Sequence, residues 1–370
     1  MVLKIKIYNK IKIKSNNIKD NFLNLSNHKG VILMGKRIGK NTVLMENNPC
    51  VKSFASVCGK KEAQGPLGNQ FDKIFEDTTL EESSWEKAES RLQAESVNLA
   101  LEKASLKTQD INYIFAGDLL NQCMSSAFGL RELGIPFLGQ FGACSTMAQT
   151  LFLAATTIEA GIANYSVAVT SSHFCSSERQ FRFPLNYGGQ RTPTAQWTVT
   201  GSGAIVLEHQ NNPGIKIKHA TVGKIVDLGI KDANNMGAAM APAAAKTMQS
   251  FFEDTKTHPS EYDMIFTGDL GEVGSNLFKE LMLKDGFHIG ENYNDCGLMI
   301  YQKEVQDVHA GGSGCGCSAS VLCSLILRNL RAKKWKNILF MATGALMSPT
   351  SSQQGETIPG VAHLINLVSE

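Results

Sequence analysis

The sequence predicts an α/β protein built from two similar halves. The segment IFAGDL at residues 114–119 recurs as IFTGDL at residues 265–270. A second pair of segments, GACSTM at 142–147 and CGCSAS at 315–320, shares a cysteine followed by small residues. Short apolar runs alternate with amphipathic helical stretches, which is typical of α/β units whose strands are buried on both faces. Self-similarity of this kind indicates an internal duplication.

Each half contains a repeated unit in which a helix is followed by a strand. We expect a helix over residues 85–104 before a strand over 113–116. In the second half the corresponding helix covers about 238–253 and the strand covers 264–267. Both strands end in the sequence Gly-Asp-Leu, so Asp118 and Asp269 occupy equivalent places. This recurrence favours a structural role, in which each aspartate caps the loop after its strand.

The second unit of each half begins at a cysteine. In the first half it continues as a helix to about residue 160 and a strand over 165–169. In the second half the helix continues to about residue 331 and the strand covers 337–341. An ungapped alignment pairs Cys144 with Cys317 and Thr170 with Thr343.

The halves are therefore residues 34–210 and 215–370, joined in the polar, proline-containing run around 210–214. Two halves packed against each other place their strand ends at a shared crevice, where ligand sites form. Residues 1–33 precede both halves and hold seven lysines and one aspartate. We expect this basic N-terminal extension to be disordered.

Composition excludes several classes of protein. With 43% hydrophobic residues among 370, the chain is not disordered over most of its length. The net charge of +2 gives no case for nucleic-acid binding. No stretch is long and apolar enough for a transmembrane helix or a signal peptide. The nine cysteines include no CxxC pair, and the eight histidines do not cluster, so we expect reduced thiols and no metal site.

Cys144 is the strongest local signal, because it lies between a predicted strand and the start of a long helix. A helix N-terminus favours the thiolate, which is the setting of a nucleophilic cysteine in acyl transfer. The alternative is a small buried residue that fills a tight turn.

The duplicated halves, the Ala-Cys-Ser turn and the glycine-rich turn Thr200-Gly-Ser-Gly-Ala204 make this chain resemble the thiolase superfamily, especially its ketoacyl-synthase-like branch. The resemblance implies a five-layered αβαβα architecture and a homodimer paired through the first-half sheet. It also implies that Cys144 works with two histidines, or with a histidine and an asparagine, from the loops at 267–271 and 312–318.

The sequence departs from this pattern at both loops. The first reads Thr267-Gly-Asp-Leu-Gly271 and has no histidine. The second reads Gly311-Gly-Ser-Gly-Cys-Gly-Cys317, with Cys315 about where a synthase has asparagine. Without an imidazole or amide to stabilise the oxyanion, a binding protein on an enzyme scaffold is the better interpretation. The alternative is an acyltransferase or 3-ketoacyl synthase with Cys144 as nucleophile.

A narrower resemblance, to the stage V sporulation protein AD family of endospore formers, spans almost all of 34–370. It is carried by Met34-Gly-Lys-Arg-Ile-Gly, Phe71-Asp-Lys, Gly117-Asp-Leu-Leu-Asn-Gln122, Gly142-Ala-Cys-Ser-Thr-Met147, Ser171-Ser-His-Phe-Cys-Ser-Ser-Glu-Arg-Gln-Phe-Arg182 and Gln190-Arg-Thr-Pro-Thr-Ala-Gln-Trp-Thr198. The resemblance implies non-catalytic binding of dipicolinic acid, or of its calcium chelate, during uptake into the developing spore. It implies membrane-protein partners of stage V, a peripheral place at the forespore or spore inner membrane, and no cofactor other than calcium brought in by the chelate.

A small flat dianion needs a concave site with cationic or N–H donors and some apolar surface. The candidate ligand-binding residues are Asn121, Cys144, His173, Arg191, Thr194, Gln196 and Trp197. Arg191 is the best cationic candidate, since arginine suits bidentate contacts with carboxylates. Each residue also has a plainer explanation: Trp197 suits the core, His173 suits a structural role equally well, and Arg179 and Arg182 suit the surface or a dimer interface.

Overall fold

The computed structural model describes residues 35–182, 191–209 and 213–370. The basic extension predicted at 1–33 lies outside these residues, and so does part of the join predicted at 210–214. The chain divides into a unit of residues Met1–Leu33 and a unit of residues Met34–Glu370. The fold described below is that of the second unit.

The first half contributes five strands that lie side by side in one sheet. Their order is β3 (Pro49–Gly59), β9 (Gly201–His209), β7 (Tyr165–Ser172), β5 (Tyr113–Gly117) and β6 (Phe137–Gly139). Strand β9 runs antiparallel to β3 and β7, whereas β7, β5 and β6 are parallel.

The second half repeats this order and these directions. Its strands are β10 (Ile215–Val222), β15 (Gly360–Ser369), β14 (Asn337–Ala345), β11 (Met264–Thr267) and β12 (Tyr293–Asp295). Here β15 is the antiparallel strand. A single residue pair, Lys216 with Cys50, joins the two halves of the sheet. Shorter strands complete the set: β1 (Lys36–Ile38), β2 (Thr42–Leu44), β4 (Lys73–Phe75), and the separate pair β8 (Trp197–Thr198) and β13 (Gly312–Ser313).

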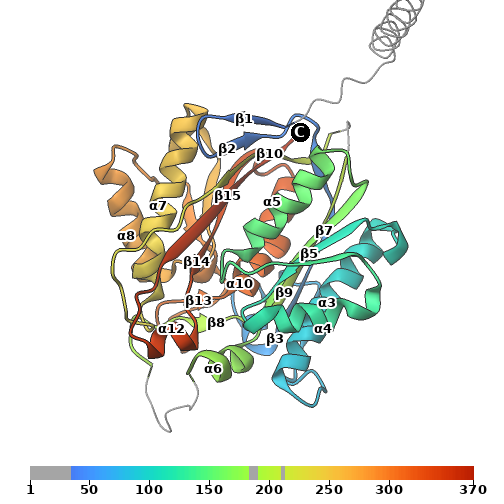
Figure 1. The fold of residues 1–370 in the computed structure, drawn as a ribbon, viewed down its shortest axis with the longest axis horizontal. Helices are drawn as coiled ribbons and strands as arrows, with labels where there is room; N and C mark the ends of the chain where they lie inside the picture. The colour runs from blue at the N-terminus through green and yellow to red at the C-terminus, as the bar shows by residue number, and fades with distance from the viewer. Residues whose placement is uncertain (1–34, 183–190, 210–212) are drawn as a thin grey trace, which may run out of the picture. The chain divides into compact units, whose positions relative to one another are not determined.

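Helices form three layers around these sheets, as Figure 1 shows. Helices α3 (Trp85–Ala104) and α4 (Met124–Leu130) cover the outer face of the first sheet. Helix α5 (Thr146–Glu159) and α10 (Cys315–Val321), which continues through a π-helical turn into α11 (Leu327–Arg331), lie between the sheets. Helices α7 (Met236–Thr255) and α8 (Gly271–Lys284) cover the second sheet. The predicted duplicated αβαβα fold is therefore confirmed. The remaining short helices are α2 (Lys60–Ala63), α6 (Phe174–Arg182), α9 (Cys296–Met299) and α12 (Pro349–Gln353).

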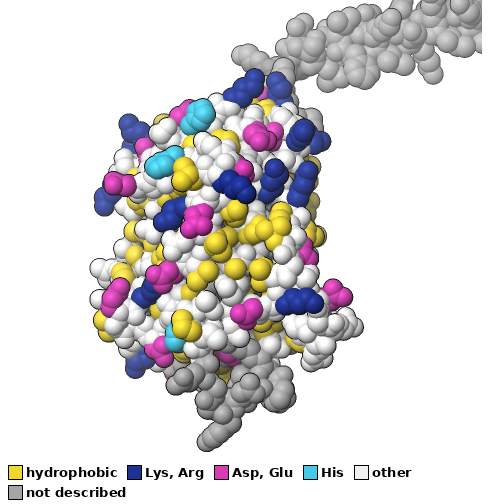
Figure 2. Space-filling model, turned by 90° about the vertical axis from the view of Figure 1, so that its left-hand side faces the viewer, with side chains coloured by type: hydrophobic (Ala, Val, Ile, Leu, Met, Phe, Trp, Pro, Cys, Tyr) yellow, Lys and Arg dark blue, Asp and Glu magenta, His cyan; other side chains and the backbone are white. Residues whose placement is uncertain are grey.

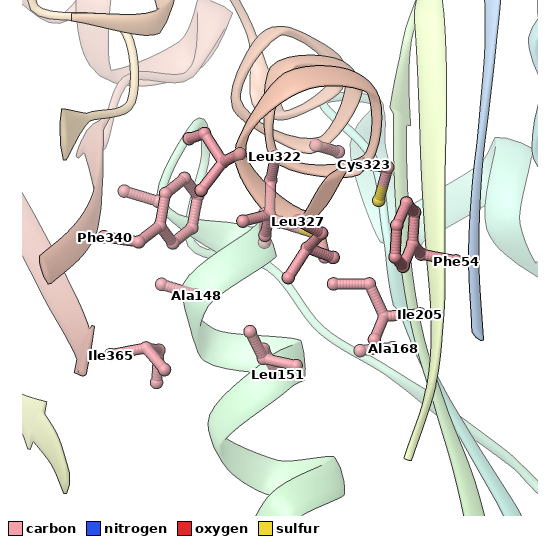
Figure 3. Close-up of a cluster of buried hydrophobic side chains, with 14 of the residues drawn as sticks. Phe54, Ala148, Leu151, Ala168, Ile205, Leu322, Cys323, Leu327, Phe340 and Ile365 are labelled. Carbon is pink, nitrogen blue, oxygen red and sulfur yellow. The ribbon is translucent and has the colours of Figure 1, made fainter. Parts of the chain in front are cut away.

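The main hydrophobic core lies in the middle helical layer, where side chains of both halves meet. Figure 3 shows Ala148 and Leu151 of α5 beside Leu322 and Leu327, with Ile205 on one side and Phe340 and Ile365 on the other. Each of these side chains is fully buried. Because burying one side chain of this size is worth about 1.5–3 kcal/mol, this layer holds the two halves together.

Local signals explain where the elements begin and end. The hydroxyl of Ser84 accepts a hydrogen bond from the Lys87 N–H at 3.3 Å and so caps α3. One sequence expectation is wrong: of residues 200–204, expected as a turn, residues 201–204 form the start of strand β9. Their glycines serve packing, since a Cβ on Gly203 would lie 2.4 Å from the carbonyl oxygen of Ala319 in α10. No helix among the described residues is long and apolar enough to cross a membrane.

Candidate functional site

A cavity of about 70 Å³ lies at the carboxyl ends of the parallel strands, where the two halves meet. This is the place where open α/β sheets bind ligands. Its walls come from both halves and are mostly apolar. They comprise Leu119, Ala143, Cys144, Ser177, Glu178, Phe181, Gln196, Thr198, Ala233, Met236, Ser313, Ala345 and Met347.

Cys144 reaches the cavity wall because of a tight turn between β6 and α5. Ala143 has a positive φ of 50°, and the turn is closed by hydroxyl groups of the following residues. Ser145 Oγ donates to the Gly142 carbonyl at 2.7 Å, and Thr146 Oγ1 donates to the Ala143 carbonyl at 2.6 Å. The thiol-bearing side chain is only 6% exposed.

The structure does not support a thiolate at Cys144. Burial raises the pKa of this thiol well above its usual value of 9.0, and the neighbouring carboxylate of Asp269 raises the pKa further. The residue also precedes the first residue of α5, Thr146, by two positions. Desolvation and a nearby negative charge therefore outweigh the helix dipole, and the Cys144 thiol beside Asp269 stays protonated at neutral pH.

Asp269 is fully buried two residues after the end of β11 and is not among the residues that line the cavity. Its Oδ2 accepts the Gly314 N–H at 2.8 Å and its Oδ1 accepts the Thr343 hydroxyl at 3.0 Å. Burial raises the pKa of Asp269 to about 7. This residue therefore connects Cys144, the glycine-rich loop and β14, rather than capping its own loop as the sequence predicted.

The equivalent residue of the first half behaves as predicted. Asp118 accepts the Leu120 N–H at 2.9 Å and both the N–H and the hydroxyl of Ser126, at 2.8 and 2.6 Å. In the second half the loop cap is Asp295, from the neighbouring strand β12. Asp295 accepts the N–H groups of Leu270 and Gly271 at 2.9 and 3.1 Å.

The glycine-rich loop brings Cys315 close to Cys144 but gives its thiol a different partner. Gly314 has a φ of 103°, and a Cβ there would lie 2.6 Å from the Ser172 hydroxyl. The Cys315 thiol donates to the Ser171 carbonyl at 2.9 Å. Cys315 and Cys144 share a small buried cluster with Leu119. The position expected for a catalytic asparagine is therefore occupied by Cys315, whose thiol is hydrogen-bonded to the backbone of strand β7.

The structure brings two of the predicted ligand residues, Cys144 and Gln196, to the cavity. Arg191 lies behind the wall, where its guanidinium pairs with Glu178 at 3.2 Å and donates to the Gln196 carbonyl. Arg191 therefore positions Glu178 and Gln196, which line the cavity, but Arg191 does not line the cavity itself.

The other predicted ligand residues support the surrounding elements. His173 Nε2 is 2.7 Å from the Thr78 carbonyl, and burial lowers the pKa of this imidazole. The Trp197 ring stacks on Phe174 with a centroid distance of 3.8 Å. Thr194 donates to the Asn234 carbonyl at 3.0 Å, and the backbone N–H of Asn121 donates to Gln180 at 2.9 Å. Of the two arginines assigned to the surface, Arg179 pairs with Glu86, and the side chain of Arg182 lies outside the described residues.

Sequence reasoning missed several wall residues, above all Ser177, Glu178 and Phe181 of α6. The spacing of Ser177 and Phe181, four residues apart on one helix face, was the available signal.

Figure 2 shows the side formed by α7 and α8, where basic and acidic side chains are mixed around a group of hydrophobic ones. No group of three or more His, Cys, Asp or Glu that could hold a metal ion occurs in the described part of the chain.

Comparisons with solved structures identify the fold. The crystal structure of 3-oxoacyl-[acyl-carrier-protein] synthase III from Aquifex aeolicus matches with a TM-score of 0.55 at 12% identity, covering 87% of this chain and 100% of that chain. Cerulenin-bound OleA from Xanthomonas campestris matches with a TM-score of 0.57 at 14% identity, covering 88% and 97%. At such low identity these likenesses show the thiolase-like fold alone.

Comparison of sequences is more specific. Stage V sporulation protein AD of Bacillus subtilis is 48% identical over 329 residues, which is 89% of this chain and 96% of that protein. The family model of stage V sporulation protein AD (SpoVAD) matches residues 39–368. The chain therefore belongs to the stage V sporulation protein AD family, a sporulation family with a thiolase-like fold.

Proposed function

We propose that this protein binds dipicolinic acid, free or as its calcium chelate, and acts in its uptake into the developing spore without catalysing a reaction. Membership of a sporulation family supports the setting. The observation that carries the proposal is the position of Cys144, a buried thiol near the Asp269 carboxylate, on the wall of a cavity between the halves. Burial and the nearby negative charge disfavour the thiolate and so oppose nucleophilic attack, whereas the small, mostly apolar cavity suits a flat small molecule.

Calorimetry with dipicolinate and with its calcium salt tests this proposal. We expect saturable binding by the folded protein with one ligand per chain. If the folded protein shows no saturable binding of either form, the protein is a scaffold and the proposal is wrong.

The rival activity, acyl transfer from Cys144, is tested with labelled acyl-CoA. We expect no acyl adduct at this residue, because the thiol is protonated and, among the described wall residues, there is no imidazole and the only side-chain amide is that of Gln196. A stable adduct on Cys144 together with turnover would overturn the proposal of a binding protein.

The proposal includes a homodimer formed through the edge strand β6. Phe137 and Leu138 of this strand are 39% and 45% exposed, and Phe141 beyond it is 46% exposed. An open, apolar strand edge invites pairing with another chain, and a second copy offers the same edge. Analytical ultracentrifugation should show a dimer that Leu138→Lys dissociates; a monomer at all concentrations would contradict it.

The proposal also includes peripheral attachment at the spore inner membrane with other stage V membrane proteins. Residues 328–336 contain Arg328, Arg331, Lys333, Lys334 and Lys336 and no acidic residue. Such a cluster is attracted to anionic lipid. Flotation with vesicles containing anionic lipid tests the lipid contribution, and a protein that stays unbound at low salt excludes it.

A further inference from the structure

Two polar atoms on the cavity wall are buried without a hydrogen-bond partner among the described residues. They are Oε1 of Gln196 and Oγ of Ser177. The side chains are only 3% and 4% exposed. A buried polar group left without a partner costs about 1–3 kcal/mol, so these atoms favour a ligand that satisfies them.

The amide of Gln196 has only one orientation that fits its surroundings. Its Nε2 donates to two backbone carbonyls, those of Asp269 and Gly312, each at 2.8 Å. A flipped amide would set its oxygen against both carbonyl oxygens. Because both N–H groups are used, Oε1 is fixed as an acceptor and requires a donor from the ligand.

The charges around the cavity oppose a dianion. Among the described wall residues, Glu178 is the only charged side chain, and it is negative and forms an ion pair with Arg191. The other titratable groups facing the site are the Cys144 thiol, the Asp269 carboxyl behind it, and the Cys315 thiol beside both. Asp269 in turn faces Asp295, Cys296 and Cys317, none of which supplies a positive charge.

We propose that the cavity binds dipicolinate as its singly protonated form, whose carboxyl O–H donates to Gln196 Oε1. This inference rests on the proposed function and specifies the chemical form of its ligand. Where free dipicolinate is a dianion, each binding event takes one proton from the buffer. The proton forms the carboxyl O–H of the ligand, and no other covalent bond forms or breaks.

Proton uptake is the direct test. Dipicolinate is titrated into the full-length protein in calcium-free buffers of different ionisation enthalpy at pH 7. We expect uptake of about one proton per ligand, and an affinity that falls about tenfold for each pH unit from 6.5 to 8.5. Saturable binding with no proton uptake overturns the inference and leaves the proposed function standing. Absence of binding at every pH overturns the inference, and the proposed function fails with it only when the calcium salt does not bind either.

A ligand that carries a permanent donor provides the matched comparison. In 6-carbamoylpyridine-2-carboxylate one carboxyl group is replaced by an amide, whose N–H groups are present at every pH. We expect this monoamide to bind with little pH dependence and more tightly than dipicolinate at pH 8.5. Weaker binding of the monoamide at that pH would show that the site prefers the dianion.

One further variant identifies the group that carries the proton. In Asp269→Asn the side chain cannot take up a proton, whereas the acceptor Gln196 remains. We expect dipicolinate still to bind with uptake of about one proton. Binding that persists while the uptake disappears would place the proton on Asp269 and overturn the assignment to the ligand.

Discussion

The two halves place the same residue after the same strand, yet they use it differently. Asp118 caps its own loop and the start of α4 through three hydrogen bonds. In the second half Asp295 caps the corresponding loop. Asp269 instead accepts hydrogen bonds from the glycine-rich loop and from Thr343, and it lies near Cys144. A duplicated fold can thus free one copy of a structural residue for a binding site when a neighbouring strand supplies a replacement.

The largest expected effect is the loss of that replacement. Asp295→Ala leaves the buried N–H groups of Leu270 and Gly271 and the hydroxyl of Thr267 without their acceptor. We expect the free energy of unfolding to fall by about 3 kcal/mol in a urea titration. Asp118→Ala is the matched variant in the first half and should cost a similar amount. If Asp295→Ala is neutral, Asp295 is not the second-half counterpart of Asp118.

The second prediction concerns Glu89, a fully buried residue of α3 that interacts with Asp118. Burial, together with the charge of Asp118, raises the pKa of Glu89 to about 8. The folded state therefore holds a proton that the unfolded state releases above its own pKa of about 4.5. The stability of the folded state is greatest below that pH and decreases as the pH rises towards 8, by up to about 1.4 kcal/mol per pH unit.

Glu89→Gln removes this titration while keeping the shape of the side chain. We expect its unfolding free energy to vary less between pH 5 and 8 than that of the native protein, as measured by urea denaturation at several pH values. An unchanged slope would show that another group carries the pH dependence. In that case Glu89 would not be the protonated carboxyl next to Asp118 in the first half.

The third prediction separates residues that line the cavity from those that support it. Arg191→Ala removes the cation that pairs with Glu178 on the wall. We expect dipicolinate affinity to fall by at least several-fold, about 1 kcal/mol, because the Glu178 carboxylate on the wall then loses the positive charge of Arg191. Glu178→Gln combined with Arg191→Ala should recover most of this loss.

Arg179→Ala is the control for this pair, since Arg179 bonds Glu86 and does not line the cavity. Its affinity should equal that of the native protein. Unchanged affinity in Arg191→Ala itself would remove Arg191 from the site.

The sequence predicted the fold well because its signals are local. Helix α3 has the bounds that its amphipathic pattern predicted, and β11 has the predicted bounds. The glycines at 201 and 203 were misjudged because the reason for them is the close approach of α10, a contact distant in sequence. The same limit applies to the site. The sequence named Cys144 and Gln196 as candidates, and both line the cavity. The role of Asp269 was not predicted, because it depends on Asp295, which only the pairing of β11 with β12 brings near.

The smallest expected effect tests the pairing of Asp269 with Cys144 itself. At pH 8 we expect iodoacetamide to modify Cys144 at least tenfold more slowly than a free thiol, because the thiolate is scarce and the side chain is buried. Asp269→Asn removes a negative charge next to the sulfur and should raise the rate several-fold. Mass spectrometry locates the modified residue, with Cys144→Ser as the control for its assignment. Rapid modification of native Cys144, unaffected by Asp269→Asn, would show that the helix dipole dominates after all, and that the first half retains an activated cysteine rather than a binding site.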